Sequence, residues 1–322
     1  MNARGSLSYP RIVFLSLPLL VAFPFAMSYL PTGSYMLHLT IMLFYYVIMA
    51  STYNLLFGYG GQLTFAHVAL AGSSGYLSGL ISLQLQVSPW LSMPIAALII
   101  AAISYAMALV CLRMRGPYLA LATLGFAESM RLIVAIEYKY TGGMMGLSVP
   151  YLLRTDSRIP YYFIALALVM LALYVVHKVV KSRLGLFIRA IREDEDVAPI
   201  IGIDNRSVKV KTFTISGFFA GLSGAFIGHY LHVLSPDNLQ INLMVMVIAM
   251  VVVGGLGSFV GPILGAIVVY LSSEYLRATL GAYHFMIFGL VVIVLMRYAR
   301  GGLVQLLGRF RVRISSALHE RR

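Results

Sequence analysis

The chain has little charge and almost no cysteine. Only 11% of its 322 residues are Asp, Glu, Lys or Arg, whereas soluble globular domains carry about a quarter. The single cysteine, Cys111, cannot form a disulfide within the chain. These shortages exclude a water-soluble globular domain and a small secreted domain held by disulfides.

The sequence also lacks the motifs of common catalytic and nucleotide-binding sites. The phosphate-binding pattern G-x-x-x-x-G-K-[ST] occurs nowhere, so the chain has no means of hydrolysing ATP by that route. The seven histidines are scattered, and no paired carboxylates lie near them at metal-ligand spacing. We therefore expect no catalytic residue, no metal and no cofactor in this chain.

The net charge of +13 does not indicate nucleic-acid binding. The basic residues fall between and beyond long apolar runs, and no basic patch is interleaved with stacking aromatics. This distribution is typical of the cytoplasmic loops of a membrane protein. We expect the lipid bilayer, and no nucleic acid, among the partners.

Apolar residues, by contrast, are abundant. They make up 60% of the chain and form runs long enough to cross a bilayer as helices. The pattern predicts an all-α, polytopic transmembrane bundle with about ten spans, eight to ten being possible, in a single domain over 1–322. The expected spans are 12–30, 35–57, 63–85, 90–112, 118–136, 160–177, 212–234, 241–256, 259–276 and 283–296.

Three of these spans need comment. The first is longer than a signal-peptide core and shows no clear cleavage site, so we interpret it as retained. The third opens with GYGGQLT, which favours a broken or re-entrant helix. The eighth and ninth are short, and GGLGSFVGP joins them as a hairpin or as two half-helices.

Charge predicts the orientation. With the N-terminus inside, ten crossings put 19 basic residues in cytoplasmic segments and four in outer loops, with Arg131 inside a span. The C-terminus, with a basic tail over 300–322, is then also cytoplasmic. An odd number of spans would place one of the large basic segments outside.

The segment 178–211 is a polar island between apolar runs. It holds eight of the 24 basic and five of the 11 acidic residues. Leu184, Ile188 and Ile191 share one helical face, which predicts a short amphipathic helix. An acidic run follows, and then an apolar segment over 199–203, containing Pro199 and Gly202, which we expect to be presented to the cytoplasm. A membrane-surface helix is one interpretation, but the acidic run favours protein docking.

Two groups of polar residues lie at membrane depth. Gln62, Thr64 and His67 suit either the wall of a path for a polar solute or hydrogen bonding between helices. Glu128 is the only carboxylate near the middle of a span, and Arg131 lies three residues later on the same face. The pair is either part of a translocation path or a self-neutralising structural pair.

A glycine cluster spans 251–266 and lacks the lysine of a phosphate-binding loop. Its glycines predict close helix packing, with an unwound hinge lining a path as the alternative. The residues concerned are Gly254, Gly255, Gly257, Gly261 and Gly265.

Several motifs in order resemble one known family, the M-type permease of branched-chain amino acid ABC importers. The resemblance covers about residues 40 to 305. Its motifs are NLLFGYGGQLTFAHVALAGSSGY, RGPYLALATLGFAESMRLI, TGGMMGLSVP, SRLGLFIRAIREDEDVAPIIGIDNRSVKVKTFTISGFFAGLSGAF, VVVGGLGSFVGPILGA and MRYARGGLVQLL. Ala66, His67 and Val68 depart from the family's usual G-H-A, Pro199 falls where small helical residues are common, and the closing pattern differs over 298–302.

The resemblance implies a transport subunit in a bacterial inner membrane. Its partners would be a second, H-type permease, two ATPase subunits that use ATP, and an extracytoplasmic substrate-binding protein. The island 178–211 would be the cytoplasmic loop coupling the permease to the ATPases, which drive alternating access. The residues matching that coupling role are Arg189, Arg192, Glu193, Asp194, Glu195, Asp196, Gly202 and Ile203.

The substrate expected from the resemblance is a branched-chain or other hydrophobic amino acid, with urea or short amides as alternatives. The expected path residues are Gln62, Thr64, His67, Glu128 and Arg131. Two readings from other classes stay open: a stand-alone secondary transporter, for which Glu128 is the only candidate ion site, and a scaffold without transport.

Overall fold

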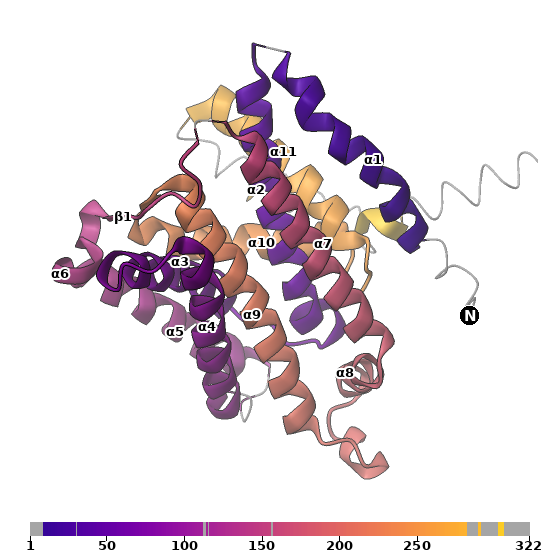
Figure 1. Ribbon diagram of the computed structural model, residues 1–322. Helices are drawn as coiled ribbons and strands as arrows, with labels where there is room; N and C mark the ends of the chain where they lie inside the picture. Colours follow the sequence, from indigo (N-terminus) through magenta and orange to yellow (C-terminus); the bar gives the residue numbers. More distant parts are fainter. Residues whose placement is uncertain are drawn as a thin grey trace, which may run out of the picture.

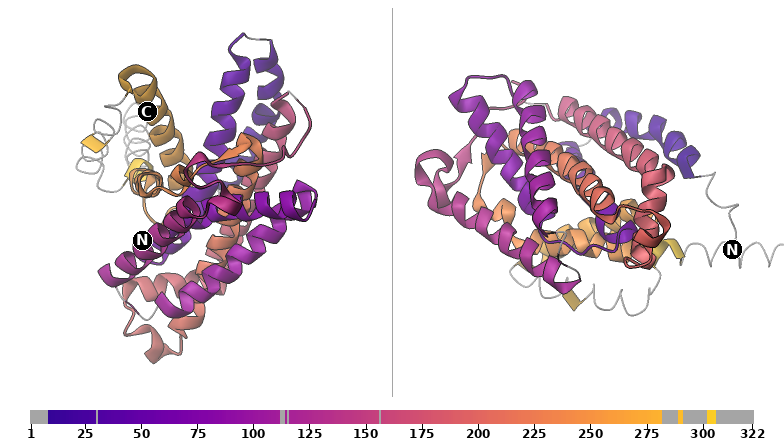
Figure 2. Two further views of the ribbon diagram at one scale, coloured as in Figure 1. Left: turned by 90° about the vertical axis from the view of Figure 1, so that its left-hand side faces the viewer. Right: turned by 90° about the horizontal axis from the view of Figure 1, so that it is seen from below.

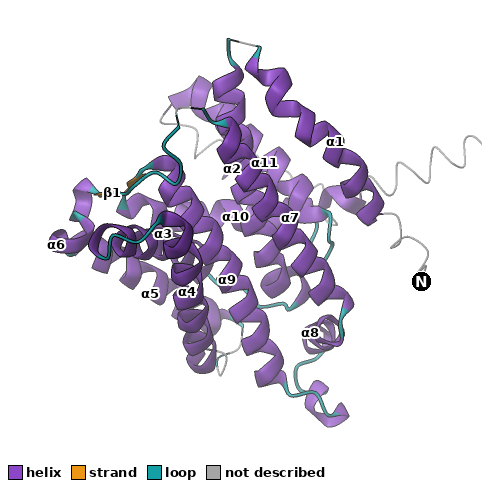
Figure 3. Cartoon of the chain, viewed as in Figure 1, coloured by secondary structure: helices purple, strands orange, loops and turns teal. Residues whose placement is uncertain are grey.

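The computed structural model describes residues 9–29, 31–111, 114, 116–155, 157–281, 289–290 and 302–305. Helices dominate these residues (Figures 1 and 3), and the two strands form one antiparallel pair of two residues each. The longer helices are α1 (Tyr9–Ser28), α2 (Gly33–Asn54), α3 (Ala66–Gln84), α4 (Pro89–Cys111), α5 (Pro117–Ile136), α7 (Ile159–Lys181), α8 (Arg183–Glu193), α9 (Asn205–Leu231), α10 (Ile241–Gly254) and α11 (Gly261–Leu280).

Short elements connect these helices. A π-helical turn, η2 (Leu55–Tyr59), continues α2, and a 3₁₀ turn, η4 (Ala198–Ile201), follows α8. The other short elements are α6 (Tyr138–Thr141), η3 (Gly143–Met145), β1 (Leu147–Ser148), β2 (Val233–Leu234) and η5 (Pro236–Leu239).

Five helical segments are long and apolar enough to cross a membrane. They are Gly33–Tyr59, Pro89–Cys111, Pro117–Ile136, Ile159–Lys181 and Asn205–Leu231. Shorter apolar helices cover Pro18–Met27 and Ile241–Gly254. The prediction of a helical membrane protein is confirmed, whereas the number of ten spans and the orientation of the termini stay predictions.

Helix α9 occupies the centre of the bundle (Figures 1 and 2), where it packs against α3, α4 and α2. Small residues on α9 permit this close approach. Gly221 faces Ala97 and Ile100 of α4, and Gly224 faces Ala71 of α3. On the other side of α2, a large apolar core joins α2, α7, α9, α10 and α11.

The structure changes the predicted boundaries in two places and leaves a third outside the described residues. The third span does not begin at Leu63: residues 60–65 are not helical, Gly61 has a φ of +67°, and α3 starts at Ala66. Helix α9 begins at Asn205, seven residues before the predicted span, because Asp204 caps it by accepting a hydrogen bond from the Ser207 N–H. Most of the predicted span 283–296 lies outside the described residues.

The contact between α9 and α3 predicts that Gly224 cannot be replaced by a larger residue without loss of stability. A Cβ atom at Gly224 would overlap the backbone of Ala71, whereas none of the described atoms lies within 4 Å of such an atom at Gly125 on α5. Gly224→Leu should therefore lower the free energy of unfolding by about 1–3 kcal/mol or more through overpacking, and Gly125→Leu should not. Thermal unfolding of the purified chain in detergent measures both, and equal melting temperatures would contradict this packing.

Candidate functional site

The polar island folds into a compact unit at one end of the bundle. Helix α7 runs to Lys181, α8 follows after Ser182, and the chain turns through η4 before α9 begins. Figure 1 shows α8 beyond the end of α7, at the opposite end of the bundle from the loop that joins α1 to α2. The predicted amphipathic helix is confirmed, with Ile188 and Ile191 on its buried side.

The apolar side of α8 packs inward and does not lie open. Ile188 and Ile191 are buried in a cluster with Leu55 and Tyr59 of the π-helix and with Val208 of α9. A membrane-surface helix would place these side chains in lipid. In the described structure, the protein itself covers them.

Two arginines of α8 contact the π-helical end of α2. The guanidinium of Arg189 lies 5.2 Å from the centre of the Tyr59 ring, within the range of a cation–π interaction. Arg192 donates a hydrogen bond from Nη1 to the carbonyl oxygen of Gly58. Carbonyls at a helix C-terminus lack helical partners, so a cation is favoured there.

The acidic run divides into residues with different contacts. Oδ1 of Asp194 accepts hydrogen bonds from the backbone N–H groups of Asp196 and Val197, which shapes the turn after α8. Glu195 forms an ion pair of 2.7 Å with the buried Lys209 of α9. Glu193 and Asp196 have exposed side chains.

The apolar segment after the acidic run is only partly exposed. Gly202 adopts a φ of +84° and reverses the chain, but Ile203 points inward and is buried with Ile188. Ile200 and Ile201 are exposed instead, at 81% and 68% of their surface. The sequence predicted the whole segment 199–203 at the surface, but it did not reveal that Ile203 turns inward, because tertiary contacts decide that.

The expected path residues Gln62, Thr64 and His67 lie at the start of α3, buried between helices. The Tyr53 hydroxyl donates to the Thr64 carbonyl, and the Phe65 N–H donates to Thr123 Oγ1 of α5. Three buried polar atoms there have no hydrogen-bond partner among the described residues: Gln62 Oε1, Thr64 Oγ1 and His67 Nδ1. Such atoms suit water molecules or a polar solute.

A cavity of about 650 Å³ opens beside this segment at the α8 end. Gln62 lines it, together with Arg192, Glu195 and Lys209 of the island and Leu119 of α5. Thr64 and His67 are not among its lining residues. One expected path residue, Gln62, therefore lines the same cavity as two expected coupling residues, Arg192 and Glu195.

Glu128 and Arg131 form an ion pair on α5, with Arg131 Nε 2.9 Å from Glu128 Oε1. Their side chains are 43% and 25% exposed, on a helix whose outer face also carries Leu121 and Leu132. The pair lines none of the cavities described for the chain and lies apart from Gln62. A half-exposed ion pair near the middle of a span should face protein or water and not lipid.

The five glycines of the cluster 251–266 have two structural roles, in helix packing and in the turn between α10 and α11. Cβ atoms at Gly254, Gly261 and Gly265 would overlap backbone atoms of the facing helix or turn, so these residues permit close helix packing. Gly255 and Gly257 have φ values of +121° and +69° and form the turn between the two helices.

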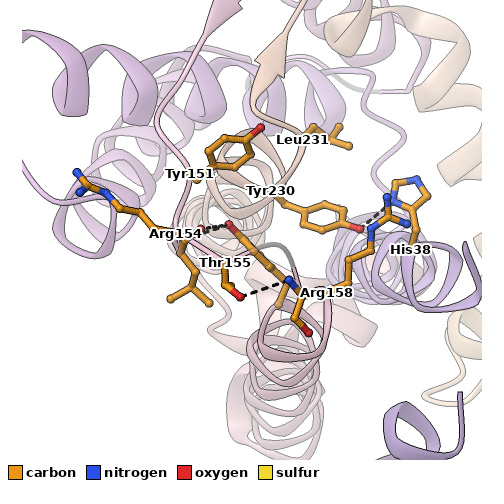
Figure 4. Close-up of a pocket in the computed structure, with 10 residues that line it drawn as sticks. His38, Tyr151, Arg154, Thr155, Arg158, Tyr230 and Leu231 are labelled. Atoms are coloured by element: carbon orange, nitrogen blue, oxygen red, sulfur yellow. Dashed lines mark hydrogen bonds between the residues drawn. The ribbon is translucent and has the colours of Figure 1, made fainter. Parts of the chain in front are cut away.

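A second cavity, of about 520 Å³, lies at the other end of α7 (Figure 4). His38 Nδ1 lies 2.8 Å from the Tyr230 hydroxyl, and Arg158 donates to the Ser34 carbonyl at 2.7 Å. Figure 4 shows Arg154 extending away from Tyr230. Sequence reasoning missed this cavity because its residues come from α2, the loop before α7, and α9. Among the residues the structure describes, no three His, Cys, Asp or Glu form a metal-binding group.

Comparison with known proteins gives one consistent result. Residues 35–296 match the family described as the permease component of the branched-chain amino acid transport system. The chain is 30% identical over 316 residues to the high-affinity branched-chain amino acid transport system permease protein LivM of Escherichia coli K12, covering 89% of this chain and 73% of that protein.

Other relatives include the second kind of permease from the same organism. LivH of Escherichia coli K12 is 25% identical over 265 residues, covering 71% of this chain and 84% of LivH. A probable LivM of Methanocaldococcus jannaschii is 23% identical over 210 residues, covering 60% of this chain and 61% of that protein. No solved structure matches the chain.

The ion pair between α8 and α9 predicts a difference within the acidic run. Glu195→Ala leaves the buried Lys209 ammonium without this carboxylate, which should cost about 1–3 kcal/mol of unfolding free energy. Glu193→Ala changes an exposed neighbour and should be close to neutral. Thermal unfolding of both variants in detergent checks the prediction, and a melting temperature of Glu195→Ala equal to that of the unchanged protein would contradict it.

Proposed function

Since the chain belongs to the permease family of branched-chain amino acid transport systems, and to its M-type branch, we propose that it is the translocating subunit of an ATP-driven ABC importer. The observation that carries the proposal is the family match over 35–296, which includes the whole island 178–211. As a permease component it is a transport protein and not an enzyme. Separate ATPase subunits would bind and hydrolyse the ATP.

The α8 end is the proposed contact with the ATPases. Its buried apolar face is already used inside the chain, so the surface left for a partner is the turn with Val197, Ile200 and Ile201, together with Leu186 and Phe187 on the outer side of α8. Exposed isoleucines rimmed by charge are typical of a protein interface. Movement of this surface with the ATPases would drive alternating access.

The outer face of α5 is the proposed contact with a second, H-type permease. LivH relatives match this chain over most of their length, so the two permease kinds share a fold and can pair around an approximate two-fold axis. The half-exposed Glu128–Arg131 pair would then face the partner or the path between the subunits.

The proposed substrates are branched-chain or other hydrophobic amino acids, delivered by an extracytoplasmic binding protein to a complex in the bacterial inner membrane. Urea and short amides are the alternative within the same family. A stand-alone secondary transporter is disfavoured because Glu128, its only candidate ion site, is already paired with Arg131. A scaffold without transport is also disfavoured, because it would give no role to the cavity at the α8 end.

Reconstitution in proteoliposomes tests the proposal. The chain, an H-type permease, two ATPases and the binding protein, all from one source, should take up leucine, isoleucine or valine only with ATP. The chain alone should show no uptake under a proton or sodium gradient. Uptake by the chain alone would overturn the ABC assignment. Uptake of urea in place of leucine would replace amino acids by urea and short amides as the substrate class.

Replacement of the exposed turn residues tests the ATPase contact. Ile200→Asp together with Ile201→Asp should reduce ATPase co-purification and uptake at least about tenfold, because charge is placed in a desolvated interface. Met145→Asp, an equally exposed apolar residue near β1, should leave ATPase co-purification unchanged. Undiminished ATPase binding in the double variant would place the contact elsewhere.

A further inference from the structure

Asn54 connects two segments more than 200 residues apart in sequence. Its Nδ2 donates to the carbonyl of Ser258 at 2.9 Å, and its Oδ1 accepts from the N–H of Gly257 at 3.1 Å. Both partners lie in the turn 255–260 between α10 and α11. The Asn54 side chain is 1% exposed, so these bonds form away from water.

The same turn lies against the π-helix that follows Asn54. A Cβ atom at Gly58 would come within 2.6 Å of the Gly257 N and would overlap Asn54 Oδ1. A Cβ atom at Gly257 would meet the carbonyl oxygen of Gly58 and Nη1 of Arg192, each at 3.0 Å. Gly58, Gly257 and Arg192 are therefore in direct contact.

The contacts form a continuous chain from α8 to the turn. Ile188 and Ile191 fix α8 on the π-helix by packing, and Arg192 holds the Gly58 carbonyl. Gly58 touches Asn54 and Gly257, and Asn54 holds the turn through both of its amide atoms. Every connection is a hydrogen bond or a close contact, so α8 and the turn cannot shift separately without breaking one.

We propose that Asn54 is a positioning residue that transmits the movement of α8 to the turn 255–260 and so to the angle between α10 and α11. The inference rests on the proposed function, in which ATPases move α8. The π-helix is suited to this part, because its i→i+5 hydrogen bonds interrupt the regular helical pattern, and such turns are frequent at functional sites. Gly255 and Gly257, both with positive φ, give the turn backbone conformations that other residues rarely adopt.

Transport measurements test this role. Asn54→Ala in the reconstituted complex should lower amino-acid uptake about tenfold, the scale of losing a buried hydrogen-bonded pair, while ATP hydrolysis falls much less. Gly58→Ala should lower uptake to a similar degree although Asn54 is still present, because the alanine methyl group would displace the Asn54 side-chain amide. Ser51→Ala is the matched control, since it removes a buried hydroxyl one turn earlier on α2 that has no hydrogen-bond partner among the described residues.

Two single-cysteine reporters separate transmission from simple loss of structure. In a Cys111→Ser background, an environment-sensitive fluorophore is placed at Leu186→Cys on α8 or at Leu256→Cys in the turn, both exposed. In otherwise unchanged protein, ATP should change both signals. With Asn54→Ala, the ATP-dependent change should persist at position 186 and disappear at position 256.

Persistence of both signals in Asn54→Ala would overturn the inference, because the turn would follow α8 without the amide. Loss of both signals would also overturn it, because Asn54 would then be needed for folding or assembly. A complex without the Asn54 change that shows neither uptake nor any ATP-dependent signal at position 186 would instead contradict the proposed function.

Discussion

Where a helix ends inside a bundle, its backbone groups lose their helical partners, and the architecture here depends on side chains that bond to those groups. The chain is interrupted at 60–65 and again at 255–260. Tyr53 and Thr123 serve the first segment, and Asn54 serves the second. These three side chains thus satisfy backbone groups that the helices leave free in the two segments.

This constraint links the fold to the proposed function. In the proposed function, the two segments held by side chains would move, whereas the close packing of α9 on α3 and α4 through small residues would stay fixed. The cavity beside Gln62 lies next to the first interruption, and α8 contacts the π-helix that leads into it.

Much of the fold could be predicted from hydropathy, since the positions of the apolar runs match the helices described. The amphipathic spacing of Leu184, Ile188 and Ile191 correctly predicted α8. The spacing did not reveal that α8 turns this face toward Tyr59, because tertiary contacts decide what covers an apolar side. For the same reason Ile203 was expected at the surface and is buried, and the cavity of His38 and Tyr230 was missed.

The burial of the inner face of α8 has a consequence for how such transporters diversify. The side chains that hold α8 in place differ from those left at the surface: Ile188 and Ile191 are buried in the bundle, whereas Ile200 and Ile201 are exposed. Under the proposed ATPase contact, a lineage could alter which ATPase it accepts by changing a few surface positions while the membrane domain keeps its fold. Exchange of ATPases between related uptake systems would then take few substitutions.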